Sequence, residues 1–394
     1  MSNYKIEDNS PTKIKVIGIG GGGCNAVRRM LEEKMSAVEF IAVNTDVQVL
    51  NNYSAQVKDR RLITFPIGNN LTHGLGAGGR PEIGRQAAEE DSEKIESILK
   101  GTDMVFLTAG MGGGTGTGAI SVFGKIAKKV GALTIAVVTL PFEFEGKRKM
   151  KLAQDGVREL TDCVDAIIVI PNQKIFKVTT TSTAVLDAFK LADDVLLNGV
   201  KGISDLITCT GVVNVDFNDL KTVMVGSGAA LMGVGVGEGE NGDIDAALHA
   251  INNPLLEDIS IKGAKGVLIN ITGGESLPLS SVQNIVNLIQ EYVDEDATIK
   301  PGLVIDPTKN GQIQVSIVAT GFPEKQETKE VEVLEINEEE PKNLSASQWE
   351  SAIESPLSNY ASSSNKPFTL EENNIPTDTF HLPPFLREAM IKKK

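Results

Sequence analysis

Two clusters of glycine hold the residues best suited to chemistry in this sequence. The first reads GIGGGGCN over residues 18–25, and the second reads GMGGGTGTG over residues 110–118. Each cluster follows a short apolar run and precedes a helical pattern. Glycine lets backbone amides approach an anion closely, and the amino terminus of a helix adds a partial positive charge. Both clusters therefore predict phosphate binding.

The second cluster is the more specific of the two. Six of its nine residues are glycine, and each costs conformational entropy on folding, so we do not expect packing alone to explain them. A nest of amides around a polyphosphate would explain them, with the hydroxyls of Thr115 and Thr117 nearby. Neither cluster contains lysine, and the chain has no GxxxxGK[ST] motif. We therefore expect amides and a metal ion to hold the phosphates, with no metal ligand from a protein side chain.

A third glycine-rich stretch, GLGAGGRPEIG, occupies residues 74–84. Within it, Ala77 and Gly78 are candidates to face a terminal phosphate. The alternative is an ordinary loop without a ligand. The residue types alone leave both interpretations open.

A phenyl ring and a carboxylate lie at helical spacing further along the chain. Phe189 and Asp193 are four residues apart in a helical pattern, so both point the same way. Their spacing alone does not assign them a ligand. The alternatives are core packing for Phe189 and a solvated helix face for Asp193.

A pair of carboxylates lies at the start of another predicted helix. Asp216 and Asp219 are three apart where a loop containing Asn214 enters a predicted helix. Such carboxylates can orient or deprotonate the attacking water in phosphoryl transfer. The alternative is a helix cap followed by a first-turn acid that the helix dipole favours.

The elements that must position these residues follow a simple order. Short apolar runs rich in Val and Ile, without strict alternation, are typical of strands buried on both faces. Helical patterns such as 26–34 and 120–130 separate them, and this alternation predicts a doubly wound parallel α/β domain. The predicted strands are 14–20, 38–46, 61–67, 104–110, 132–140 and 166–171.

The second half of the chain has a different pattern. A long amphipathic helix is predicted near 182–207, followed by a smaller α/β domain with a mixed sheet. Its predicted strands are 265–274, 297–308 and 312–322, and its predicted helices are 248–253 and 280–294. The predicted organisation is a disordered leader (1–12), a nucleotide-binding domain (13–181), a central helix (182–207), a C-terminal domain (208–322), a disordered acidic linker (323–375) and a terminal peptide (376–394).

Composition excludes several classes of protein. The formal net charge is −14, which is unsuited to general nucleic-acid binding and gives no broad attraction to anionic lipid. The three cysteines and three histidines are scattered, which excludes a zinc site and a disulfide framework. No apolar run reaches the roughly 18 residues that span a bilayer, and the first residues lack an apolar signal region.

The end of the chain combines a charged stretch with an apolar one. Residues 324–354 carry a net charge of −7, which predicts a disordered linker. Apolar residues then return in FHLPPFLREAMIKKK at 380–394, which predicts a short binding motif on a flexible arm. The alternative is a frayed terminus without a partner.

Taken in order, these motifs resemble the tubulin/FtsZ family of GTPases over about residues 13–321. The tail LPPFLREA (382–389) resembles the short peptide with which that family binds membrane anchors. The matching motifs are VNTD (43–46), GLGAG (74–78), AGMGGGTGTGA (109–119), PFEFEGKRK (141–149), IPN (170–172), DAFKLADDVL (187–196), NVDFND (214–219) and NPLLED (253–258).

The resemblance implies GTP and GDP as ligands with Mg²⁺ as cofactor. It implies that Phe189 stacks on guanine and that Asp193 accepts hydrogen bonds from the N1–H and amino groups of the base. It also implies head-to-tail filaments in which Asn214, Asp216 and Asp219 of one subunit complete the nucleotide site of the next. The implied GTP-binding residues are Gly21, Gly22, Gly23, Cys24, Asn25, Gly113, Gly114, Thr115, Gly116, Thr117, Gly118, Glu145, Lys149, Asn172, Phe189 and Asp193, with Ala77 and Gly78 toward the γ-phosphate.

The resemblance further implies a cytoplasmic protein of the bacterial division ring. Its partners would be other copies of the chain, and membrane-anchor and regulatory division proteins, with no nucleic acid and no transmembrane segment of its own. The implied partner-binding residues of the tail are Leu382, Pro383, Phe385 and Leu386.

Two positions within these motifs need separate expectations. Lys149 stands where the family commonly has arginine, and lysine cannot make a bidentate fork to phosphate. Cys24 is expected at a helix amino terminus, where the pKa of a thiol tends to fall. We therefore hypothesise an alkylatable thiol that nucleotide protects, the alternative being a small buried side chain.

Two other functions compete with a self-assembling GTPase. An NAD-dependent oxidoreductase is argued from the match of residues 18–23 to GxGxxG and from Asp46 as a ribose ligand. It leaves the second glycine cluster and the tail without a role. A structural filament that binds GTP without cleaving it is the third interpretation.

Overall fold

The computed structural model describes residues 12–322 except 34, 36–37, 58, 60, 178, 180–182, 209–212, 214 and 254–260. Several sequence predictions lie outside the described residues. These are the leader up to residue 11, the acidic linker, the terminal peptide with its four candidate residues, and Asn214.

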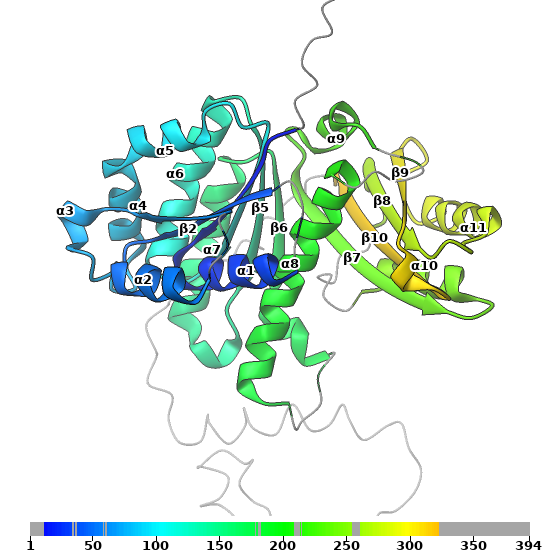
Figure 1. The fold of residues 1–394 in the computed structure, drawn as a ribbon, viewed down its shortest axis with the longest axis horizontal. Helices are drawn as coiled ribbons and strands as arrows, with labels where there is room; N and C mark the ends of the chain where they lie inside the picture. Colours follow the sequence, from blue (N-terminus) through cyan, green and yellow to red (C-terminus); the bar gives the residue numbers. More distant parts are fainter. Residues whose placement is uncertain are drawn as a thin grey trace, which may run out of the picture. The chain divides into compact units, whose positions relative to one another are not determined.

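The described strands form one ten-stranded sheet in the order β3-β2-β1-β4-β5-β6-β7-β10-β8-β9 (Figure 1). The six strands from β3 to β6 are all parallel, which confirms the predicted doubly wound α/β half. The strands are β1 (Ile14–Ile19), β2 (Val38–Asn44), β3 (Leu62–Pro66), β4 (Met104–Gly110), β5 (Leu133–Leu140), β6 (Ala166–Pro171), β7 (Gly228–Glu238), β8 (Gly266–Gly273), β9 (Thr298–Ile305) and β10 (Gln312–Thr320).

The C-terminal strands form the mixed sheet that the sequence predicts. Strand β10 is antiparallel to both β7 and β8, while β9 is parallel to β8. One feature was not predicted: residues 166–168 of β6 pair with residues 228–230 of β7, so the two sheets are continuous. Strand β7 itself was also missed.

The helices alternate with the parallel strands. The α-helices are α1 (Gly20–Glu32), α2 (Val47–Gln56), α3 (Asn69–Thr72), α4 (Pro81–Glu90), α5 (Ser92–Leu99), α6 (Thr115–Lys129), α7 (Lys147–Thr161), α8 (Val185–Thr208), α9 (Phe217–Met224), α10 (Gly242–Ile251) and α11 (Leu279–Gln290). Short 3-10 helices are η1 (Glu143–Glu145), η2 (Asn172–Lys177) and η3 (Pro307–Lys309). Among the described helices, none combines the length and apolar character needed to cross a membrane.

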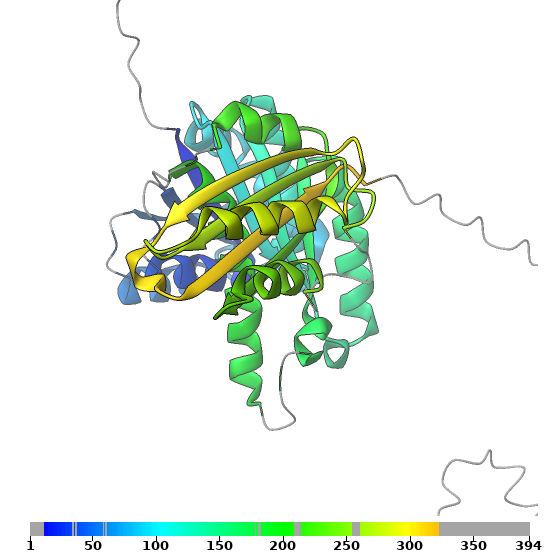
Figure 2. The same cartoon turned by 90° about the vertical axis from the view of Figure 1, so that its right-hand side faces the viewer.

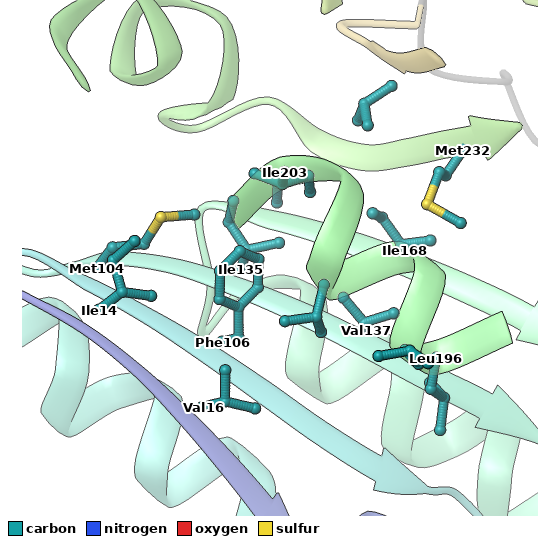
Figure 3. Packing of buried hydrophobic residues seen from close by; sticks show 14 of the residues in the cluster. Ile14, Val16, Met104, Phe106, Ile135, Val137, Ile168, Leu196, Ile203 and Met232 are labelled. Atoms are coloured by element: carbon teal, nitrogen blue, oxygen red, sulfur yellow. The ribbon is translucent and has the colours of Figure 1, made fainter. Parts of the chain in front are cut away.

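The period-two geometry of the strands sends side chains to two separate cores. Ile14 and Val16 of β1 pack beneath α1, α8 and α9, and Figure 3 shows this cluster around Phe106. Ile17 and Ile19 of the same strand face the opposite side, beneath α4, α5, α6 and α7. The parallel half is therefore buried on both faces, as its uninterrupted apolar runs predict.

The long helix α8 occupies the middle of the described chain. Its buried residues, including Val200 and Ile203, pack against both β5 of the parallel half and β8 of the C-terminal half. Helices α10 and α11 cover the opposite face of the C-terminal strands (Figures 1 and 2). Helix α8 therefore connects the two halves of the sheet through one shared core.

Candidate active site

A cleft of about 510 Å³ opens at the carboxyl ends of β1 and β4. The strand order reverses between these two strands, because β2 lies on one side of β1 and β5 lies beyond β4. Doubly wound sheets bind ligands at this kind of switch point. The lining residues are Gly20, Gly21, Gly22, Asn25, Gly110, Met111, Gly113, Gly114, Thr115, Gly116, Thr139, Pro141, Glu145, Lys149, Asn172, Leu186, Phe189, Ala192, Asp193 and Leu196.

The amino termini of two helices meet at this cleft. Helix α1 begins at Gly20, within the first glycine cluster. Helix α6 begins at Thr115, within the second. Among the described residues, no side chain caps either amino terminus, and neither first turn contains an acid. Two uncapped amino termini directed at one cleft provide amide donors and partial positive charge for an anion.

Some of the glycines leave open space in the cleft. A Cβ atom built on Gly21 or on Gly113 would meet nothing within 4 Å. These two positions are the ones at which a missing side chain leaves room for a ligand. They lie one in each cluster, so both clusters contribute to the same cradle.

Most glycines of the second cluster also have a packing role, which the sequence does not reveal. A Cβ atom on Gly112 would lie 2.7 Å from Lys149, one on Gly114 would lie 2.9 Å from Ala77, and one on Gly116 would lie 2.9 Å from the carbonyl oxygen of Gly110. These glycines are needed because the backbone packs closely with its neighbours. Packing therefore explains more of the cluster than the sequence predicted.

The threonines of the second cluster are engaged within the protein. The hydroxyl of Thr117 accepts a hydrogen bond from the amide of Gly112 at 2.7 Å, and Thr117 does not line the cleft. The hydroxyl of Thr115 lies 2.7 Å from that of Thr45 at the end of β2. Thr115 does line the cleft, whereas Thr117 fixes the shape of the loop.

The hypothesis of a reactive thiol at Cys24 is wrong. Its side chain is 1% exposed and packs with Ala42, Leu50 and Tyr53, away from the cleft. Burial raises the pKa of the Cys24 thiol to about 12, with a backbone hydrogen bond to Val43 opposing the rise only in part. Desolvation of the thiolate outweighs the helix dipole here, so the side chain is a small buried filler.

Two charged side chains of the cleft form an ion pair. Lys149 donates to the carboxylate of Glu145 one turn away, and the other carboxylate oxygen of Glu145 accepts the amide of Phe142 at 2.9 Å. These contacts fold the segment around η1 and the start of α7 against the cleft. The positive charge of Lys149 is thereby offset before any ligand arrives.

Asn172 provides an observation that points directly to a ligand. Its side chain is 6% exposed and lines the cleft, and its Oδ1 atom has no hydrogen-bond partner among the described residues. An orphaned buried acceptor costs free energy unless something donates to it. A ligand with hydroxyl or amino groups, such as a nucleoside, would satisfy it.

The predicted base-binding pair lies at one end of the cleft. Phe189 and Asp193 both project from the first half of α8 into the same wall. The ring of Phe189 is 39% exposed and meets Phe142 edge-on at 5.3 Å between centroids. The ring is thus held by an aromatic neighbour while the side chain stays accessible, which suits stacking on a base.

Asp193 is held in an environment that disfavours its charge. Burial raises the pKa of this carboxyl to about 6, and the nearby Arg28 only partly opposes the rise. A raised pKa in a cleft is typical of a functional group, because a ligand can supply what the apo protein lacks. Donors from a guanine base would compensate the buried carboxylate.

Several predicted phosphate contacts do not line the cleft. Gly23 is buried against Thr108 and Gly18, while Ala77 lies behind Gly114. Gly78 is exposed in the loop beyond Ala77. The γ-phosphate assignments of Ala77 and Gly78 therefore stay predictions.

The candidate catalytic residues are far from this cleft in the same chain. The cleft residues of α8 end at Leu196, and α9 follows only after Thr208 (Figure 1). From Asp193 to Thr208 the helix is about 22 Å long at 1.5 Å per residue. The structure therefore does not bring Asp216 and Asp219 to their own chain's cleft.

The local geometry of these two carboxylates agrees in part with the simpler alternative. Asp216 caps α9 by accepting the amide of Asp219 at 2.6 Å, and its side chain is exposed. The carboxylate of Asp219 instead accepts a hydrogen bond from Lys300 of β9 at 2.6 Å. Capping accounts for Asp216, but it does not account for the ion pair of Asp219.

Asp46, the ribose ligand of the oxidoreductase alternative, has a structural role. It caps α2 by accepting the amides of Gln48 at 2.9 Å and Val49 at 3.2 Å, and it does not line the cleft. A committed cap leaves no reason to assign Asp46 to a ribose. The main observation for a dinucleotide is thereby removed.

Sequence reasoning missed several lining residues, including Met111, Thr139, Leu186 and Ala192. Leu186 had a usable signal, because it lies three residues before Phe189 on the same helical face. Thr139 had another, at the carboxyl end of a predicted strand.

Among the described residues, no group of three or more His, Cys, Asp or Glu side chains could hold a metal ion.

Comparison with known families gives two matches that together cover both halves of the described chain. A model of the GTPase domain of the Tubulin/FtsZ family matches residues 13–180. A model of the C-terminal domain of the FtsZ family matches residues 228–323.

Solved structures agree with these matches. An empty dimer of FtsZ from M. jannaschii is 43% identical with a TM-score of 0.74, and the match covers 80% of this chain and 89% of that one. A mutant of the same protein gives 43% identity, a TM-score of 0.73, and coverage of 79% and 92%. CetZ2 from Haloferax volcanii, solved as a GTPγS-bound protofilament, shares the fold at 19% identity with a TM-score of 0.67, and that match covers 80% of this chain and 95% of CetZ2.

Proposed function

Since the chain belongs to the tubulin/FtsZ family of GTPases, we propose that it is a filament-forming GTPase of the bacterial division ring. GTP binds in the cleft at β1 and β4, and hydrolysis takes place where the loop of one subunit meets the cleft of the next. The single observation that carries this proposal is the separation of the cleft from Asp219 along α8.

The cleft chemistry supports a guanine nucleotide in one orientation. The phosphates lie over Gly21 and Gly113, where two helix amino termini supply amide donors. The base lies against Phe189, with its N1–H and amino groups donating to Asp193. Asn172 accepts from the nucleoside between them, which satisfies its orphaned oxygen.

We propose that Mg²⁺ binds with the nucleotide through phosphate oxygens and water. When bound, the ion offsets the charge of the phosphates. The protein's contribution is positional: the amides of the two glycine clusters hold the phosphate chain, and the Glu145–Lys149 pair borders it. Lys149 is already paired with Glu145. It can therefore contact phosphate only if its ammonium group bridges the carboxylate and the phosphate, or leaves the carboxylate.

The hydrolytic step needs a group that orients water behind the γ-phosphate. Asp219 is suited to this because its carboxylate is half-buried and held at Oδ1, with Asp216 fixing the first turn of α9. Asn214 lies in the same loop and is proposed to contact the same water. Since α8 separates these groups from their own cleft, only a neighbouring subunit supplies them in head-to-tail assembly.

Assembly of related proteins supports the same arrangement. One matched FtsZ structure is a dimer, and the more distant CetZ2 structure is a protofilament with GTPγS. A filament that binds GTP without hydrolysing it is the competing function. Turnover that requires Asp219 separates the two.

A mixing experiment tests the composite site. Asp193→Ala removes guanine recognition but leaves the loop intact, and Asp219→Asn removes the loop carboxylate but leaves the cleft intact. Each variant alone should release phosphate slowly, and mixing them should restore release, because the loop of the first completes the cleft of the second. Asp245→Asn, an exposed first-turn acid of α10, is the matched control and should retain normal turnover. No recovery on mixing, or normal turnover by Asp219→Asn alone, would rule out the composite site.

Nucleotide and tail are tested separately. Light scattering should rise with GTP and stay flat with GDP or ATP, with phosphate release appearing cooperatively as protein concentration increases.

We further propose that residues 376–394 bind membrane-anchor and regulatory proteins and bring filaments to a cytoplasmic ring at mid-cell. Deleting them, or Phe385→Ala, should abolish anchor binding at unchanged GTPase activity. Retained anchor binding would refute this role.

A further inference from the structure

The edge strand β9 supports the proposed catalytic loop at three points. The amide of Leu303 donates to the carbonyl of Val213 at 2.9 Å, just before Asn214. A Cβ atom built on Gly302 would lie 2.7 Å from Leu206 and 3.4 Å from Val215, so the missing side chain makes room for both. The third contact is the ion pair of Lys300 with Asp219.

The ion pair is not explained by the usual role of a lysine on an edge strand. Such lysines extend into solvent and discourage pairing with other chains. Lys300 instead lies only 32% exposed, with its Nζ atom 2.6 Å from Oδ1 of Asp219, which is 38% exposed. The two residues are 81 positions apart in the chain, so tertiary structure and not local propensity brings them together.

We propose that Lys300 is a positioning residue for Asp219. It holds Oδ1 and so fixes the orientation of the carboxylate, while Oδ2, which has no partner among the described residues, is left to orient the attacking water. Its positive charge also reduces repulsion between Asp219 and the phosphates as the loop enters the next subunit. This inference rests on the proposed composite site.

The neighbouring cation on α9 provides a natural comparison. The ammonium group of Lys221 lies 4.7 Å from the ring centroid of Phe217, and in the described part of the chain Asp219 makes its ion pair with Lys300 instead. Removing either lysine changes the net charge by the same amount, close to the same loop. If GTP turnover requires the ion pair itself and not the local charge, removing Lys300 should lower turnover and removing Lys221 should not.

The test measures GTP turnover per assembled subunit together with the critical concentration for assembly. Lys300→Met should lower turnover by about ten-fold, the loss expected for one charged hydrogen bond, with a nearly unchanged critical concentration. Lys300→Arg should recover most of the activity. Lys221→Met should behave like the unchanged protein. A purely structural role would instead raise the critical concentration and lower the melting temperature.

A double variant separates this inference from the proposed function. Lys300→Met added to Asp219→Asn should cause no further loss, because Lys300 acts through Asp219. Normal turnover by Lys300→Met beside impaired Asp219→Asn would overturn the inference and leave the function standing. Normal turnover by Asp219→Asn would overturn the function first. If Lys300→Met does not fold, Lys300→Gln replaces it with the same expectations.

Discussion

A Cβ atom built on Gly118 would lie 1.9 Å from the carbonyl oxygen of Pro81, so α6 and α4 touch through their backbones. This contact belongs to the same nine-residue cluster whose Gly113 opens into the cleft. One short stretch therefore performs two tasks, which are helix packing and the formation of a ligand cradle. The two tasks can be separated by substitution.

Replacing each of these two glycines by alanine should impair a different property of the protein. Gly118→Ala places a methyl group against fixed backbone, so we expect it to cost about 3 kcal/mol or more in the free energy of unfolding. Gly113→Ala meets no atom and should leave stability nearly unchanged while weakening GTP binding, because the methyl group projects into the cleft. Thermal unfolding and nucleotide titration check both. Equal destabilisation by the two variants would contradict this division.

The buried charge of Asp193 should lower the stability of the apo protein while it favours guanine binding. Because burial raises its folded-state pKa to about 6, its contribution to stability is fully present below its unfolded pKa and is lost as pH rises through 6. At pH 7.5 the apo protein therefore carries a penalty on the order of 3 kcal/mol, and Asp193→Asn should remove it. The same variant should bind GTP much more weakly, and GTP affinity of the unaltered protein should fall as pH drops below 6.

The adjacent residue provides the control for this prediction. Asp194 makes an ion pair with Arg29 at 2.7 Å, so Asp194→Asn should lower stability or leave it unchanged. Unfolding measured at pH 7.5 and at pH 4 distinguishes the two carboxylates. A destabilised Asp193→Asn at pH 7.5 would show that the carboxylate is compensated within the apo protein.

Cys24 should resist alkylation whether or not nucleotide is bound. Its thiol has a pKa of about 12 and is buried, so almost no thiolate forms at pH 8 and no reagent reaches it. Mass spectrometry after treatment with iodoacetamide should find Cys24 unmodified in the folded protein and modified in urea. Labelling of the folded protein that GTP suppresses would restore the hypothesis of a reactive thiol.

Much of the fold follows from sequence pattern, and the exception is instructive. Strands such as β4 and β5 are continuous apolar runs, and their pattern has no other reasonable interpretation. Strand β7 was missed because glycine alternates along it at 233, 235 and 237. A Cβ atom on Gly235 would lie 2.1 Å from the carbonyl oxygen of Ala246, so these glycines allow α10 to pack directly on the strand. Apolar periodicity is weak in a strand whose positions facing one of its two packing partners lack side chains.

The candidate site shows the same limit. Helical spacing was enough to bring Phe189 and Asp193 into one wall, because both lie on a single element. The ion pair between Lys300 and Asp219 joins two elements that no local pattern relates. The two interpretations of Cys24 could not be separated for a similar reason, since burial by a neighbouring helix outweighs its position at the start of α1 and confirms the small buried side chain.

The length of α8 has a consequence for how the rate should scale in the proposed assembly. Each subunit offers a cleft near one end of this helix and an acidic loop beyond the other, so a filament of n subunits contains n−1 finished joints. A pair of subunits shares a single working joint, while a long filament approaches one per subunit. Phosphate release per subunit would then serve as a gauge of mean filament length, and an agent that only shortens filaments would behave in an assay as an inhibitor.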